Sequence, residues 1–185
     1  MDGAGTVSPS ASNTYTGTTS ITGGTLLLGA ANALHANSNV SLSGGTLATG
    51  SNSSAAGNLT PAGSSVTNLG GGSSALTFNS IVSIAGTLQI WNWAGAVGVP
   101  NTGSGTRLLF ESGTAGTDYT NVQFYEGGLG STAIGNGSRL FTSGSGFQLA
   151  PEPEPGALFA GLALLAPLAW RERRHWMRCA VAKRA

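Results

Sequence analysis

The sequence predicts a mainly β protein: a parallel β-helix or β-solenoid body with short closing strands, followed by a single C-terminal transmembrane helix. Three observations lead to this prediction. A six-residue motif recurs at an offset of 21 residues, the body is rich in Gly, Ser, Thr and Asn, which suit sharp corners, and an uncharged apolar run lies near the C-terminus. With 185 residues, the chain has room for one domain and a tail.

The charge of the chain is low and unevenly distributed. Asp, Glu, Lys and Arg make up 8% of the residues, against roughly 25% in an average soluble domain. None of these four residue types occurs between Asp2 and Arg107. Because nucleic-acid binding requires Lys and Arg side chains that displace counterions from phosphates, this neutral body argues against a nucleic-acid partner.

Residues 1–13 are small and polar, and we expect them to form a flexible N-terminal segment. They contain neither a basic stretch nor an apolar stretch, so they lack the pattern of a secretory signal peptide. The pattern of residues 150–185, described below, predicts an exported protein. We therefore expect the chain to be the truncated C-terminal part of a longer exported protein, with a gene remnant as the alternative.

Residues 14–106 carry the repeat that predicts the solenoid. Residues 21–26 (ITGGTL) recur as residues 42–47 (LSGGTL), and a shorter version follows at residues 84–88 (IAGTL). A degenerate copy is expected between them, around residues 66–78. A period near 20 residues is typical of solenoids, in which each coil buries its apolar edge by stacking on its neighbours.

Within one repeat the pattern is strand, corner, strand. Val40 and Leu42 are two residues apart and therefore share one face of an extended segment. The Gly44-Gly45 pair permits the positive φ angles of a sharp corner. The alternative, a flexible Gly/Ser/Thr linker, is disfavoured by apolar clusters such as Leu26-Leu27-Leu28.

These repeats resemble a known family. Residues 14–26 (TYTGTTSITGGTL), 28–34 (LGAANAL) and 39–47 (NVSLSGGTL) are similar to the autotransporter-associated β-strand repeat. Such repeats build the β-helical passengers of surface-displayed bacterial proteins. The resemblance therefore implies a β-helical body on an exported protein of a Gram-negative bacterium.

The end of the body contains aromatic residues and further short strands. Residues 88–93 (LQIWNW) predict a strand with Trp91 and Trp93 on the same face. Two interpretations remain: the tryptophans form a sugar-stacking platform, or they cap the open end of the solenoid against pairing with other chains. Residues 107–149 predict a closing β region, with short strands separated by Gly-rich turns.

The sequence shows no catalytic, cofactor-binding or metal-binding arrangement, and we expect a protein without enzymatic activity. A glycosidase needs two carboxylates placed across one bond, whereas the carboxylates of residues 14–149 lie singly, namely Glu111, Asp118 and Glu126. His35 and His175 are isolated, and Cys179 is the only cysteine, so neither a histidine pair nor a cysteine-based metal site is expected.

Residues 150–156 form a Pro-Glu motif and linker, beginning with Pro151, Glu152 and Pro153. Proline fixes φ and lacks the N–H group. We therefore expect an extended stretch that joins no β-ladder and ends the solenoid.

Residues 157–170 carry no charge and predict the transmembrane helix. A helix over residues 156–170 is about 22 Å long, shorter than the ~30 Å hydrocarbon core of a bilayer, so flanking arginines are expected to snorkel to the interface. Residues 171–185 form a basic tail. It begins directly after the apolar run with three arginines, Arg171, Arg173 and Arg174. The positive-inside rule predicts that these arginines fix the orientation, with the C-terminus in the cytoplasm.

This order of Pro-Glu-Pro, short transmembrane helix and arginine-rich end resembles the PEP-CTERM sorting signal. The resemblance implies recognition by an exosortase, a membrane transpeptidase similar to cysteine proteases, and cleavage near the motif. We therefore expect a non-enzymatic protein with a structural or adhesive role, held transiently in the inner membrane and then delivered to the cell surface or extracellular matrix, where polysaccharide is a further expected partner. The alternatives are a polysaccharide-binding or polysaccharide-degrading β-helix module, a truncated remnant, and a plain tail-anchored helix.

Overall fold

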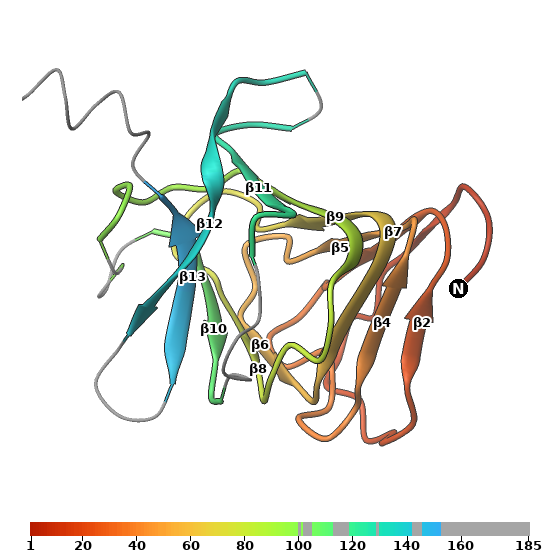
Figure 1. Cartoon of the computed structure of the whole chain (residues 1–185). Coiled ribbons are helices and arrows are strands. Elements are labelled where there is room, and N and C mark those ends of the chain that lie inside the picture. Colours follow the sequence, from red (N-terminus) through yellow and green to blue (C-terminus); the bar gives the residue numbers. More distant parts are fainter. Residues whose placement is uncertain (100, 102–104, 113–118, 129, 142–145, 153–185) are drawn as a thin grey trace, which may run out of the picture. The chain divides into compact units, whose positions relative to one another are not determined.

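The computed structural model describes residues 1–99, 101, 105–112, 119–128, 130–141 and 146–152. These residues form a mainly β body without helices, wound into a β-solenoid of about 4 turns (Figure 1). The predictions of a mainly β class and of a solenoid are therefore confirmed. The strands are β1 (Thr6–Val7), β2 (Thr19–Ile21), β3 (Thr25–Leu27), β4 (Val40–Ser43), β5 (Thr46–Ala48), β6 (Ser54–Ala56), β7 (Leu59–Asn68), β8 (Ala75–Phe78), β9 (Ala85–Trp91), β10 (Arg107–Phe110), β11 (Val122–Tyr125), β12 (Ala133–Phe141) and β13 (Phe147–Pro151).

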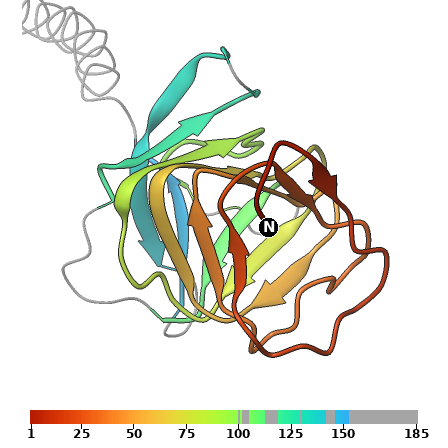
Figure 2. The same ribbon diagram turned by 90° about the vertical axis from the view of Figure 1, so that its right-hand side faces the viewer.

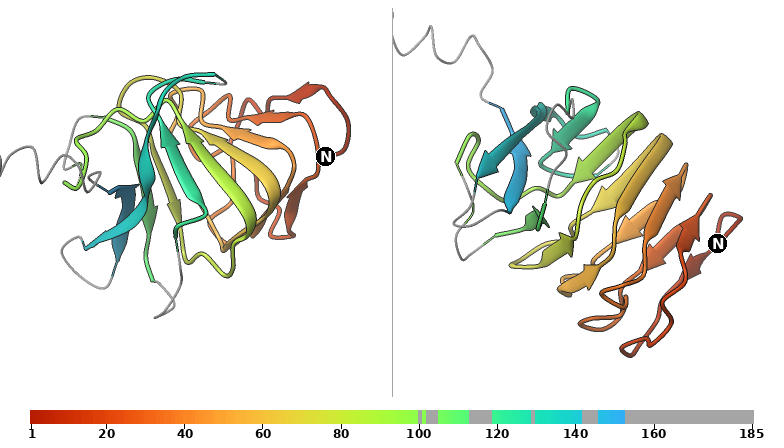
Figure 3. Two further views of the ribbon diagram at one scale, coloured as in Figure 1. Left: turned by 45° about the horizontal axis from the view of Figure 1, so that its top comes forward. Right: turned by 60° about the horizontal axis from the view of Figure 1, so that its bottom comes forward.

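The strands stack in three rows of parallel neighbours. The first row consists of β1, β3, β5, the second half of β7, β9 and β11. The second row consists of β2, β4 and the first half of β7, and the third of β6, β8 and β10. Figure 2 views the stack from its N-terminal end, and Figure 3 shows the successive coils side by side.

The sequence repeat corresponds to one coil of the solenoid. Ile21 pairs with Leu42, and Leu26 pairs with Leu47, so the two copies of the motif lie directly on one another at an offset of 21 residues. In each copy only one of the two corner glycines has a positive φ, Gly24 at 64° and Gly44 at 109°. The corner therefore needs the conformational freedom of glycine at one position of the pair.

The next copy of the motif lies earlier than the sequence predicts. Residues 66–78 are not its core, because β7 spans the corner without a break and already pairs with both strands of the preceding coil. Ser43 pairs with Ala62 and Thr46 with Val66, so β7 has one more residue at the corner than the coil before it. This extra residue hides the repeat in the sequence.

The core is built from columns of inward-facing side chains. Along the first row, Leu26, Leu47, Thr67, Ile90 and Phe124 occupy successive positions of one column. All five are buried. Each buried Leu, Ile or Phe stabilises the stack by about 1.5–3 kcal/mol relative to an exposed side chain, and each coil therefore depends on its neighbours for this burial.

The third row contains a stack of phenylalanine rings. Phe78 and Phe110 are in register, with ring centroids 5.8 Å apart, and Phe147 of β13 continues the stack at 5.1 Å from Phe110. All three side chains are fully buried. Such ring pairs contribute about 0.5–1.5 kcal/mol beyond the burial of their area.

The N-terminal residues belong to the solenoid. The sequence predicts a flexible segment over residues 1–13, whereas β1 pairs with β3 and Thr22 N–H donates to the carbonyl of Met1 at 2.9 Å. Asn13 Nδ2 also donates to the carbonyl of Ala33 at 2.6 Å. The unpaired edges of the first full coil provide partners for this polar segment, although its own sequence has no apolar pattern.

The C-terminal end of the solenoid is closed by antiparallel strands. The predicted closing region begins at residue 107, but β10 and β11 still continue the parallel rows. Closure is made by β12 and β13 instead: β12 pairs antiparallel with β11 and β13, and β13 pairs antiparallel with β10. The last edges of the first and third rows are therefore covered, as Figure 1 shows at the end opposite the N-terminus.

The predicted transmembrane helix, residues 157–170, and the basic tail, residues 171–185, lie outside the described residues. Within the part of the chain that the structure describes, no helix has the length and apolar character needed to cross a membrane.

Candidate functional site

The Pro-Glu-Pro motif begins inside the folded body. Pro151 is buried and is the last residue of β13, where it pairs with Gly137 of β12. Its carbonyl accepts a hydrogen bond from Gly98 N–H at 3.0 Å, and Glu152 N–H donates to the carbonyl of Asn136 at 2.8 Å. Glu152 itself is exposed.

The expectation that Pro151 joins no ladder is therefore wrong. Proline lacks only the N–H group, and at the end of a strand its carbonyl can still accept a hydrogen bond. The other residues of the predicted sorting signal, namely Pro153, Arg171, Arg173 and Arg174, lie outside the described residues.

The two tryptophans of β9 and its extension lie on opposite sides of the sheet. Trp93 is 3% exposed and packs edge-on against Phe124, with ring centroids 5.0 Å apart. Trp91 is partly exposed on the outer face. The prediction of a shared face is wrong because Asn92 has a φ of 57°, which breaks the alternation of the strand after Trp91.

Trp91 has a partner on the outer face that strand alternation alone does not predict. Its Nε1 donates a hydrogen bond to Gln89 Oε1 at 3.0 Å. On the next strand, Tyr125 Oη donates to Gln123 Oε1 at 3.0 Å. Because Gln89 and Gln123 are in register, the two glutamine–aromatic pairs lie on neighbouring strands of one face. The sequence holds a signal for this arrangement, since Gln-Ile-Trp at residues 89–91 recurs as Gln-Phe-Tyr at residues 123–125.

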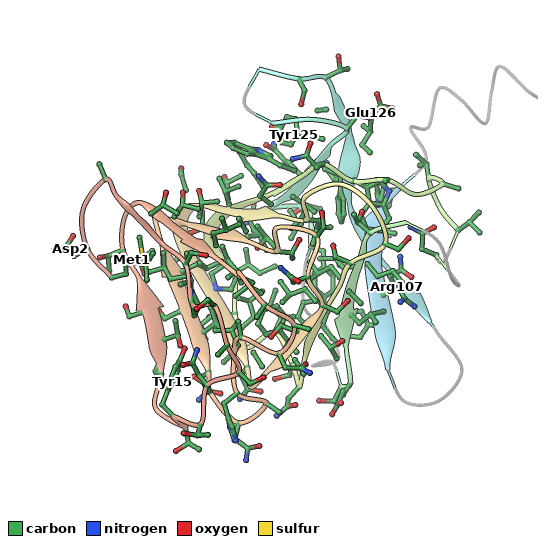
Figure 4. The ribbon with its side chains drawn as sticks, turned by 180° about the vertical axis from the view of Figure 1, so that it is seen from behind. Met1, Asp2, Tyr15, Arg107, Tyr125 and Glu126 are labelled. Atoms are coloured by element: carbon green, nitrogen blue, oxygen red, sulfur yellow. The ribbon has the colours of Figure 1, made fainter. Side chains whose placement is uncertain are left out.

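The outer face of the first row carries no charge on its strands. Its outward side chains are neutral, among them Thr25, Leu27, Thr46, Val66, Asn68, Gln89, Trp91, Gln123 and Tyr125. Glu126, which is exposed, follows Tyr125 at the end of β11 (Figure 4). The outer face of β9 and β11, with its aromatic rings and amides, is therefore suited to neutral polar ligands.

Glu111 and Glu126, the two of the three carboxylates in residues 14–149 that the structure describes, do not lie together. Glu111 follows β10 of the third row, whereas Glu126 follows β11 of the first row. Asp118 lies outside the described residues. Among the residues that the structure describes, no group of three His, Cys, Asp or Glu side chains is placed to hold a metal ion.

Comparison with known proteins gives no further assignment. No protein-family model, curated protein or solved structure matches the chain. The fold assignment therefore rests on the strand pairing of the structure, and the family resemblances rest on the residues of the repeat and of the C-terminal motif.

Proposed function

We propose that the chain is a non-enzymatic, exported protein of the bacterial cell surface or extracellular matrix, with a C-terminal sorting signal that an exosortase processes. The observation that carries the proposal is the order of three segments: Pro-Glu-Pro from Pro151, an uncharged run over residues 157–170, and arginines from Arg171. In this proposal the apolar run holds the precursor in the inner membrane, and the basic tail keeps the C-terminus in the cytoplasm.

The position of the motif relative to the fold supports this proposal. Glu152, whose N–H group donates a hydrogen bond to the carbonyl of Asn136, is the last residue that the structure describes, and the rest of the signal follows it in the sequence. Cleavage C-terminal to Glu152 therefore leaves all thirteen described strands, β1 to β13, intact. Cleavage before Pro151 removes a residue of β13 that is buried and accepts a hydrogen bond.

The closed end of the solenoid supports a structural role at the surface. Exposed sheet edges promote uncontrolled pairing between chains. The antiparallel strands β12 and β13 cover the edges of β11 and β10, beside the point where the signal begins. A body with this end closed can remain a discrete unit after it is released.

The test is processing in a host that has the sorting enzyme, compared with the same host lacking it. The chain is expressed behind a cleavable export signal, and its mass and location are measured by immunoblotting of membrane and surface fractions. We expect a shortened surface form in the first host and a full-length membrane form in the second.

Two variants sharpen this comparison. Replacement of Arg171, Arg173 and Arg174 by alanine should prevent processing, because the predicted membrane orientation is lost. The matched control replaces Lys183 and Arg184, which lie beyond the arginine cluster, and should be processed as the original chain is. Equal processing with and without the sorting enzyme contradicts the proposal.

A further inference from the structure

We propose that the outer face of β9 and β11 binds a neutral polysaccharide chain, with Trp91 and Tyr125 as the rings on which sugars stack. The inference deepens the adhesive role proposed above and rests on that role for its biological setting. The site itself is defined by contacts within the described body and does not depend on the sorting signal.

The two rings are held in place before any ligand arrives. Each ring donates its polar hydrogen to the glutamine two residues earlier on its own strand, Trp91 to Gln89 and Tyr125 to Gln123, both at 3.0 Å. These bonds restrict the side-chain rotations that a ligand would otherwise have to arrest, which lowers the entropic cost of binding. The backbone bond from Trp93 N–H to the carbonyl of Tyr125, 3.0 Å long, ties the two strands together at this point.

The spacing of the rings follows from the solenoid. Val122, Gln123 and Phe124 pair in register with Leu88, Gln89 and Ile90. Trp91 and Tyr125 each follow the last residue that is paired between these two strands, and neighbouring strands are about 4.8 Å apart, so the two residues lie on adjacent strands of the same face. Both side chains are partly exposed. A pyranose ring has an apolar face of C–H groups, which packs on an aromatic face of this kind.

Hydrogen-bonding groups surround the rings. Because each glutamine uses its Oε1 to accept from a ring, its NH₂ group remains as a donor. Neither NH₂ group donates a hydrogen bond within the described residues. Asn92 Nδ2 donates to Asn68 Oδ1 at 2.7 Å, which places a third and a fourth amide beside the strand end of Trp91. Sugar hydroxyls, which both donate and accept, match such a row of amides.

The charge of the face selects the class of polysaccharide. A phosphate-bearing or uronic-acid polymer would require Lys or Arg side chains, and the outward residues of the first row have none. Glu126 lies beside Tyr125 (Figure 4) and adds a negative charge, which disfavours an acidic polymer further. The ligand is therefore a neutral chain.

The test is affinity electrophoresis of the purified full-length chain in mild detergent, in native gels that contain hydroxyethylcellulose or xyloglucan. We expect retardation by at least one of these neutral polysaccharides, with no change when salt is raised. Trp91→Ala and Tyr125→Ala should each weaken binding about tenfold, which corresponds to about 1.4 kcal/mol. Trp91→Phe should retain most of the binding, because the stacking face remains.

The matched control is Tyr15→Ala. Tyr15 is 43% exposed and lies far from Tyr125 in Figure 4, so its removal should leave retardation unchanged. The proposal is overturned if neither neutral polysaccharide retards the chain, if Trp91→Ala is retarded as strongly as the original, or if only acidic alginate retards it in a salt-sensitive way. Retardation without processing in the host contradicts the sorting proposal alone, and processing without retardation contradicts this inference alone.

Discussion

The corner glycines of adjacent coils provide a sharp test of the stacking. Gly86 has a φ of 135° and pairs with Gly63 of the preceding coil. A Cβ atom at Gly86 would lie 2.2 Å from the carbonyl oxygen of Gly63 and 2.7 Å from its carbonyl carbon and its nitrogen. All three atoms are backbone, so no flexible side chain can move aside. We therefore predict that Gly86→Ala forces the two coils apart at this corner.

The cost has two parts. Overpacking of a closely packed contact costs about 1–3 kcal/mol, and a non-glycine residue in an unfavourable backbone region costs about 1–3 kcal/mol. Gly86→Ala should therefore lower the free energy of unfolding by about 2–6 kcal/mol, a large part of the ~5–15 kcal/mol of a typical domain. Gly63→Ala is the matched control, because Gly63 has a φ of 59° and no atom within 4 Å of its added Cβ. Its cost is the backbone term alone, about 1–2 kcal/mol.

The assay is urea unfolding of both variants and the original chain, followed by far-ultraviolet circular dichroism. The free energies of unfolding are compared for variants whose m value, the slope of the free energy against urea concentration, equals that of the original chain. Equal destabilisation by Gly63→Ala and Gly86→Ala would contradict this prediction, because the close approach of the two coils would then have no energetic consequence.

Two further predictions concern the inside and the outside of the first row. Thr67→Val should raise the free energy of unfolding by about 1–2 kcal/mol, because Thr67 Oγ1 is buried without a hydrogen-bond partner among the described residues. As a control, Thr46→Val on the outer face should change the free energy of unfolding little. A lower free energy of unfolding in Thr67→Val would contradict the burial of an unpaired hydroxyl. Trp93→Ala should lower the free energy of unfolding by about 3–5 kcal/mol, because the ring packs against Phe124 in the core. Trp91→Ala should lower it by less than about 1 kcal/mol, and equal losses in urea unfolding would show that the two rings are not on opposite sides.

The sequence predicts the solenoid where the coils are most regular. Residues 21–26 and 42–47 have the same length between strands, and in-register stacking preserves that length as a visible period. The copy in β7 escapes detection because one additional residue lies between Ala62 and Val66. A sequence period shows the stacking only as long as every corner has the same number of residues.

The candidate sites are harder to predict because single backbone angles decide them. Simple alternation places Trp91 and Trp93 together, but the positive φ of Asn92 turns Trp93 into the core. Pro151 pairs with Gly137 of β12, and this tertiary contact cannot be inferred from the backbone preferences of proline alone. The glutamine–aromatic pairs are present in the sequence as a repeated tripeptide, and only the register of β9 and β11 shows that they share one face.

The central proposal, sorting and cleavage at the C-terminus, is tested most directly by the mass of the mature protein. The measurement is intact-protein mass spectrometry of the chain isolated from the surface of a host with an active sorting enzyme. We predict a C-terminus beyond Glu152 and before the apolar run of residues 157–170, so that β13 is retained and the basic tail is lost. Surface-located chains that still end at Ala185 would contradict the account.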